Sequence, residues 1–295
     1  MRRRSLIKGL STLPIIGLIA CKSKGQVERE MNTQVDSETE VADVAAGTEV
    51  SMPAGVEAST STGNQTEVEW ASGQTSLIEV AYPDDTLFDM TNSCALALSA
   101  STTKGPCYFK DETGEDISLG LEGLPVQLCL KLVDANCLPL SNYTIEVWHC
   151  DIHGVYSGDL SESRDSDGFA TSFCTGDMES AIQSTWYRGQ RVSNEQGRVN
   201  FKSQFPGWYP GRTVHIHFAV SDAEGNSRLI SQFCFTDALV DEVYTQHPLY
   251  RERGGQDTPL NSDGVFPSSH LEPFIFNTKK TRDGSLLAYQ TIKVL

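Results

Sequence analysis

Short segments rich in β-branched and aromatic residues recur through the second half of this 295-residue chain, and turn-forming residues separate them. Such segments, in which apolar and polar residues partly alternate, predict β-strands. Long helical periods are scarce, and only residues 237–246 have the spacing of an amphipathic helix. The pattern favours an all-β sandwich or barrel. The expected strands are VQLCLKLVD (126–134), YTIEVWHCD (143–151), GRVNFKSQF (197–205), TVHIHFAV (213–220), RLISQFCF (228–235) and LAYQTIKVL (287–295).

Residues 1–20 read as an export signal and not as part of a fold. Three arginines precede an apolar run that is too short to span a membrane. The stretch from Arg3 to Lys8 resembles a twin-arginine signal, and LIAC resembles a lipobox in which Cys21 accepts the lipid. We therefore expect export by the twin-arginine route and a membrane-anchored lipoprotein, periplasmic or at the cell surface, whose anchor lies on the membrane without crossing it. An ordinary cleaved secretion signal is the alternative.

Residues 21–86 are predicted to be an acidic, disordered tether. No Lys or Arg occurs between Arg29 and Lys104, and the chain as a whole has a formal net charge of −16. Low hydrophobicity with one sign of charge cannot offset the entropy of ordering. So acidic a chain also argues against nucleic acid as a partner. Residues 87–295 remain, enough for one domain with a sizeable core; the sequence leaves its oligomeric state open.

The cysteines fit an exported protein, in which disulfides persist. No CxxC spacing occurs, so a structural zinc cluster is not expected. Because the number of cysteines other than Cys21 is odd, at least one thiol stays free or pairs outside the chain. A Cys137–Cys150 disulfide is plausible, although sequence alone cannot assign the pairing. The seven are Cys94, Cys107, Cys129, Cys137, Cys150, Cys174 and Cys234.

Two alternating histidines, His215 and His217, lie within the expected strand 213–220. Residues two apart on a strand point to the same face, with Cα atoms about 6–7 Å apart. Two neutral imidazoles so placed can ligate one transition metal, although the motif also occurs as ordinary polar strand residues. Tyr209 and Arg212 lie just upstream, and a phenolate oxygen is a suitable ligand for a trivalent cation. Either residue can also be a plain surface residue of the turn.

Several ordered motifs together resemble the intradiol ring-cleavage dioxygenases, the family of catechol and protocatechuate enzymes. The resemblance runs from about Cys94 to the C-terminus. It departs from the family pattern at Cys107, where many relatives have an aromatic residue, and in the short gap between Tyr209 and His215. The motifs are GPCYF (105–109), CLPLSNYTIEVWHCDIHGVYSG (137–158), FPGWYPGRTVHIHF (205–218) and RLISQFCF (228–235).

The resemblance implies a β-sandwich of mostly antiparallel strands with long loops and few helices. It also implies a mononuclear non-haem Fe(III) centre whose ligands are two tyrosines, Tyr156 and Tyr209, and two histidines, His215 and His217. Tyr209 matches the ligand that leaves when substrate binds. Arg212 and Gln232 match catalytic residues beside the bound ring.

The activity so implied is aromatic-compound catabolism. A catechol-type diol is cleaved between its two hydroxylated carbons with O2, giving a muconate-type diacid. The identity of the ring substituents stays open. Two alternatives remain: a membrane-tethered, non-catalytic binding module of the same fold, and a zinc or copper hydrolase-like site built on the two histidines.

Overall fold

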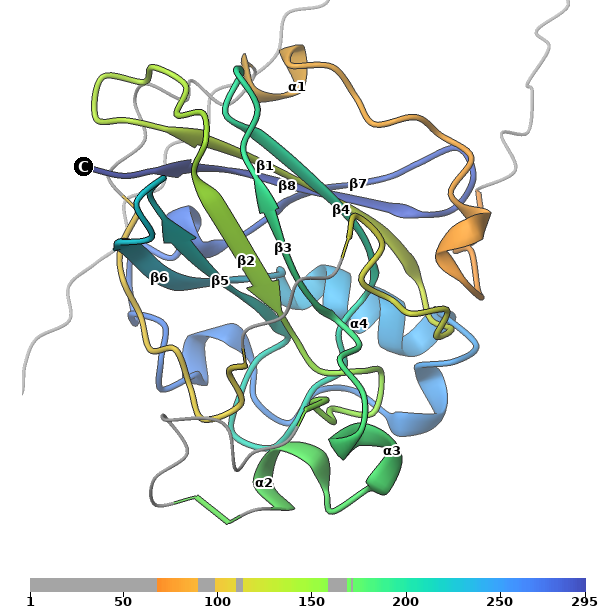
Figure 1. Cartoon of the computed structure of the whole chain (residues 1–295). Coiled ribbons are helices and arrows are strands. Elements are labelled where there is room, and N and C mark those ends of the chain that lie inside the picture. The colour runs from red at the N-terminus through yellow and green to blue at the C-terminus, as the bar shows by residue number, and fades with distance from the viewer. Residues whose placement is uncertain (1–67, 90–98, 110–113, 159–168, 171) are drawn as a thin grey trace, which may run out of the picture. The chain divides into compact units, whose positions relative to one another are not determined.

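The computed structural model describes residues 68–89, 99–109, 114–158, 169–170 and 172–295. Within these ranges the strands form two four-stranded sheets, in the orders β4-β1-β8-β7 and β3-β2-β5-β6 (Figure 1). Every strand pair is antiparallel except β1 with β8, which are parallel. The strands are β1 (Pro125–Val133), β2 (Thr144–Trp148), β3 (Arg188–Val192), β4 (Arg198–Gln204), β5 (His215–Ser221), β6 (Ser227–Cys234), β7 (Asn277–Lys280) and β8 (Leu286–Lys293).

Helices are short and lie outside the sheets (Figure 1). The expected helix 237–246 is confirmed, and it begins where the Thr236 side chain accepts a hydrogen bond from the Leu239 amide. No helix in the described ranges is long and apolar enough to cross a membrane. The helices are α1 (Thr86–Asp89), α2 (Ser172–Thr175), α3 (Glu179–Ile182) and α4 (Asp237–Gln246), with 3₁₀ turns η1 (Thr75–Leu77), η3 (Arg251–Arg253), η4 (Leu260–Ser262) and η5 (Glu272–Phe274).

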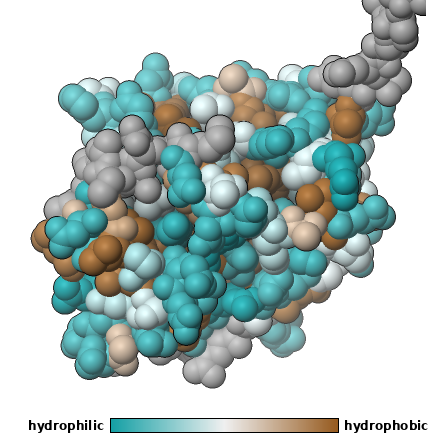
Figure 2. Space-filling view, turned by 90° about the horizontal axis from the view of Figure 1, so that it is seen from above, coloured by the Kyte–Doolittle hydropathy of each residue, from teal (hydrophilic) through white to brown (hydrophobic). Residues whose placement is uncertain are grey.

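The two sheets enclose one main hydrophobic core, to which every strand but β3 and β7 contributes buried apolar side chains. On β5 the inward residues Ile216, Phe218 and Val220 join this core, so the alternating residues face the other way. On the face drawn in Figure 2, hydrophilic side chains predominate and hydrophobic ones lie in separate groups. The predicted all-β sandwich is therefore confirmed, and it fixes which side of β5 carries the histidines.

The last part of the predicted tether is folded. Residues 68–86 were expected to be disordered, but Gly73 forms a β-bridge with Gly123, with both backbone hydrogen bonds at 2.9 Å. The amides of Glu79 and Val80 donate to the Asp283 carboxylate at 2.8 and 2.9 Å. The sequence does not predict this folding, because hydrogen bonds from backbone amides hold these residues and they have no alternating apolar face. The rest of the tether, the signal and Cys21 lie outside the described residues.

The cysteines correct one expectation and bear out another. Cys150 is a buried free thiol that donates to the Gly207 carbonyl at 3.3 Å, so the Cys137–Cys150 disulfide is not formed. The expectation of at least one free thiol holds, since Cys129 and Cys234 are free as well. A disulfide joins Cys107 to Cys174 on α2.

Candidate metal centre

Strand β5 places both histidines on one buried face. It is hydrogen-bonded to β2 on one side and β6 on the other, so its backbone is fixed along its length. His215 and His217 are 2% and 3% exposed, and their Nε2 atoms lie 3.1 Å apart. The indole of Trp148, paired with His217 across the sheet, stacks on that imidazole at 4.9 Å between ring centroids. The two rings therefore converge with little freedom to turn.

Both imidazoles are held neutral. The Nδ1 atom of His215 lies 2.6 Å from the Thr213 carbonyl, which can only accept, so Nδ1 carries the proton and Nε2 presents a lone pair. Burial, with the positive charge of Arg212, lowers the pKa of His215 to about 3. Burial likewise lowers the pKa of His217 well below its usual value. Neutral imidazole is the form that binds a metal ion.

The turn before β5 brings the Tyr209 phenol to the histidines. Pro210 and Gly211 form the middle of a turn, in which Gly211 has a φ of 85°. The Arg212 amide closes the turn by donating a hydrogen bond to the Tyr209 carbonyl at 3.3 Å. A positive φ is adopted readily only by glycine. The Tyr209 hydroxyl lies 3.2 Å from His215 Nε2. Burial raises the pKa of Tyr209 to about 12, although Arg212 opposes that rise.

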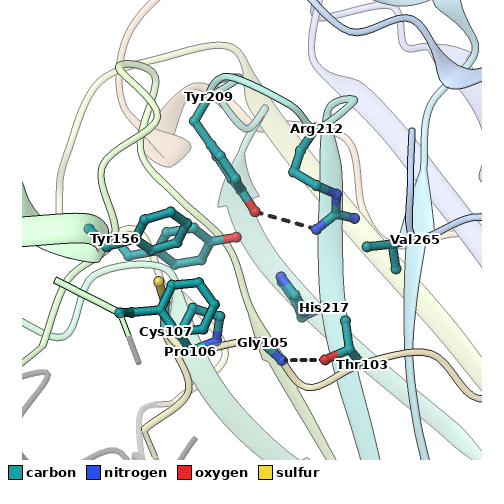
Figure 3. Close-up of a pocket in the computed structure, with 11 residues that line it drawn as sticks. Thr103, Gly105, Pro106, Cys107, Tyr156, Tyr209, Arg212, His217 and Val265 are labelled. Atoms are coloured by element: carbon teal, nitrogen blue, oxygen red, sulfur yellow. Dashed lines mark hydrogen bonds between the residues drawn. The ribbon is translucent and has the colours of Figure 1, made fainter. Parts of the chain in front are cut away.

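Tyr156 reaches the same point from the loop that follows β2. Its amide donates to the Cys174 carbonyl at 2.8 Å, and its ring lies 5.8 Å from Tyr209 and 6.2 Å from His217 between centroids. Figure 3 shows the Tyr156 and Tyr209 hydroxyls and the His217 ring directed toward one common point. The Tyr156 hydroxyl is buried beside the Tyr209 phenol without a hydrogen bond of normal geometry, and burial raises its pKa well above the usual value.

These four side chains fit a trivalent metal ion. They offer two imidazole lone pairs and two phenol oxygens, while no group of three or more His, Cys, Asp or Glu residues suited to a metal occurs in the described part of the chain. An orphaned buried hydroxyl costs free energy, which coordination as a phenolate relieves. Two phenolates offset most of a +3 charge, and hard oxygen with imidazole nitrogen suits ferric iron.

Arg212 lies beside the centre in a fixed orientation. Its Nε donates to the Asp263 carboxylate at 2.9 Å, its Nη2 to Gln232 Oε1 at 2.5 Å, and its Nη1 lies 3.5 Å from the Tyr209 hydroxyl (Figure 3). Burial alone would lower the pKa of Arg212, but the negative charges of Tyr209 and Asp263 raise it above its usual value. Gln232 in turn donates to the Thr103 carbonyl at 2.9 Å. The arginine is thus a permanent positive charge aimed at the centre.

A cavity of about 210 Å³ opens beside the four donors. Tyr156, Tyr209, His217 and Arg212 form its polar side. Its other wall is mostly apolar and comes from the segment after Thr103, from α2 and from Val265 (Figure 3). The face that carries these donor side chains is therefore open to a small ligand on one side.

Comparison with known proteins accords with this geometry. A family model described as Dioxygenase matches residues 102–248. The solved structure of an intradiol ring-cleavage dioxygenase from Tetranychus urticae is similar at 27% identity and a TM-score of 0.57, covering 68% of this chain and 95% of that chain. The chain has the intradiol dioxygenase fold. A second dioxygenase structure, also 27% identical, matches this fold with a TM-score of 0.58, covering 67% of this chain and 94% of its own. No curated protein matched the sequence.

On this fold, the six predicted ligand and catalytic residues come together from three parts of the chain, namely Tyr156, the stretch 209–217 and Gln232. Sequence reasoning missed Asp263, which lies in a loop after η4 and holds Arg212 in place. Its neighbourhood, NSDG, reads only as a turn, so no sequence signal marked it. Sequence reasoning also missed Thr103, whose backbone carbonyl accepts a hydrogen bond from Gln232. Any residue type can supply a backbone carbonyl, so the sequence does not mark this position.

Proposed function

We propose that this protein is a non-haem Fe(III)-dependent intradiol dioxygenase that cleaves a catechol-type ring between its hydroxylated carbons with O2. The observation that carries the proposal is the convergence of two buried phenols and two neutral imidazoles beside a ring-sized cavity. Tyr156, Tyr209, His215 and His217 hold the iron. When bound, ferric iron withdraws electron density from a coordinated catechol and makes its ring carbons reactive toward O2.

The residues of this chain then handle protons and charge. Tyr209 borders the cavity, and because burial raises its pKa to about 12, its phenolate would be the base that takes a catechol proton at Oη. Arg212 faces the cavity as a fixed positive charge and stabilises negative charge on the ring. Gln232 uses Oε1 to orient Arg212 and Nε2 to bind Thr103, so it acts by positioning.

The cavity supports this activity more than a purely binding role. A non-catalytic module needs no buried pair of phenols with raised pKa values, and it has no use for an arginine held by a buried carboxylate. A zinc or copper hydrolase-like site leaves both tyrosines without a role. Export by the twin-arginine route and a lipid anchor at Cys21 complete the proposal and rest on the sequence motifs alone.

The test is product analysis with isotopically labelled O2. The iron-loaded protein should convert catechol to a muconate-type diacid that contains both atoms of one O2. Arg212→Ala should lower kcat about 10²–10³-fold at unchanged iron content, the usual loss for one well-placed electrostatic donor. The exposed Arg282→Ala is the matched control and should leave kcat unchanged. A product that retains the ring, or one with a single labelled atom, would refute the activity.

A further inference from the structure

The cavity beside the metal centre is small. Apolar pockets of about 150 Å³ bind benzene, whereas pockets for drug-sized ligands span about 300–1,000 Å³. At about 210 Å³, this cavity has room for one ring and a small substituent. An extended aromatic polymer would have to remain outside it.

No spare positive charge lines the cavity among the described residues. Arg212 and His217 are the lining groups able to carry one. Arg212 is directed at the metal centre and is already paired with Asp263 at 2.9 Å, and His217 is one of the four side chains that converge on that centre. Lys104, which lies between the lining residues Thr103 and Gly105, places its ammonium over the Tyr108 ring at 3.5 Å. A carboxylate on the substrate ring would therefore lose water without gaining a partner, which is unfavourable.

Two phenylalanines on the cavity wall are unusually exposed. Phe169 and Phe173 are 46% and 51% exposed, and their ring centroids lie 4.9 Å apart. Phe173 precedes Cys174, whose disulfide to the lining residue Cys107 ties α2 to the cavity wall. The pair thus presents an apolar surface at the cavity, which a bound apolar group would cover.

We propose that the substrate is a catechol bearing an uncharged, apolar ring substituent packed against Phe169 and Phe173, and that the cavity rejects ring carboxylates. This inference rests on the proposed function, and it assigns Phe173 as a specificity-determining residue. One methyl group in an apolar pocket changes kcat/KM about 10-fold or more. The expected order is 4-methylcatechol above catechol, with 3,4-dihydroxybenzoate lower than 4-methylcatechol by about 100-fold.

The experiment measures kcat/KM for these three compounds and, separately, their affinities by anaerobic titration of the iron-loaded protein. Phe173→Ala should remove most of the preference for 4-methylcatechol over catechol. Phe173→Lys should raise kcat/KM and affinity for 3,4-dihydroxybenzoate at least 10-fold relative to 4-methylcatechol. Leu138→Lys, which adds the same charge at an exposed position remote from the cavity, is the matched control and should leave the order unchanged.

Two results would overturn the inference. The first is a native protein that binds or cleaves 3,4-dihydroxybenzoate as well as 4-methylcatechol. The second is a Phe173→Lys variant that behaves like Leu138→Lys. If no compound is oxidised but the affinities follow the expected order, the proposed function fails while the assignment of the cavity stands.

Discussion

Arg212 and Asp263 form a buried ion pair beside the proposed metal centre. The Asp263 side chain is fully buried and that of Arg212 is 14% exposed. Asp263 Oδ2 accepts from Arg212 Nε and from the Thr213 amide, both at 2.9 Å. Its Oδ1 accepts from the amides of Val265 and Phe266 at 2.8 and 3.2 Å. One carboxylate therefore fixes both the arginine and the loop that lines the cavity.

Asp263→Asn keeps the size of this side chain but removes its charge. Its NH2 group cannot accept the hydrogen bonds that Oδ2 accepts, so two donors lose their partner and the guanidinium is left without its counter-charge. Removing the charge of one partner of a buried ion pair lowers the free energy of unfolding by about 3–5 kcal/mol. In a domain of this size, 1 kcal/mol shifts Tm by about 2–4 °C, so Tm should fall by about 6–20 °C.

Denaturant and thermal unfolding of the metal-free protein measure this loss. The exposed Asp241→Asn on α4 is the matched control and should leave Tm unchanged. Adding Arg212→Gln to Asp263→Asn should recover part of the loss, because no uncompensated charge then remains. In the iron-loaded Asp263→Asn protein, kcat should fall while iron content persists. A loss of unfolding free energy below about 1 kcal/mol would refute the reasoning.

Three further predictions follow from buried groups. Tyr156→Phe removes a buried hydroxyl that has no well-formed hydrogen bond, so the metal-free protein should be at least as stable in denaturant unfolding, while iron content and colour fall. Replacing Cys107 and Cys174 by Ser opens a loop with a sequence separation of 67 and should cost about 4 kcal/mol by the same assay. Burial lowers the pKa of His149 to about 4, so between about pH 6.5 and 4 the unfolded chain binds a proton that the folded one does not. The free energy of unfolding should therefore fall by about 3 kcal/mol on acidification through that window because of this group. The urea midpoint of His149→Gln should fall less over the same pH range than that of the native protein. An equal fall in the two proteins would contradict the assignment.

Much of the fold was predictable because its strands alternate. Each expected strand overlaps one observed strand, and the helix 237–246 follows from its spacing and the cap at Thr236. Strands β3 and β7 were missed, since their sequences RGQRV and NTKK have no alternating apolar face and each forms an edge of its sheet, where charged residues are common. Alternation of apolar and polar residues thus marks strands that bury one apolar face, and an edge strand that buries few apolar side chains lacks this pattern.

The site was predictable in part. Spacing alone placed His215 and His217 on one face, because strand geometry is local. Tyr156 required the family resemblance, since a loop brings it to the histidines from another part of the chain. Asp263 and residues 68–86 are placed by hydrogen bonds between segments far apart in sequence, several of them from backbone amides to a carboxylate. A single sequence does not show which distant amides an aspartate will meet.

The central claim is that two tyrosines and two histidines hold ferric iron. The most direct measurement is a visible absorption spectrum, with metal analysis, of the purified protein after Fe(III) loading, before and after anaerobic addition of catechol. We expect equimolar iron and a tyrosinate-to-iron absorption band that shifts when catechol binds. A protein that remains colourless and free of iron after loading would contradict it.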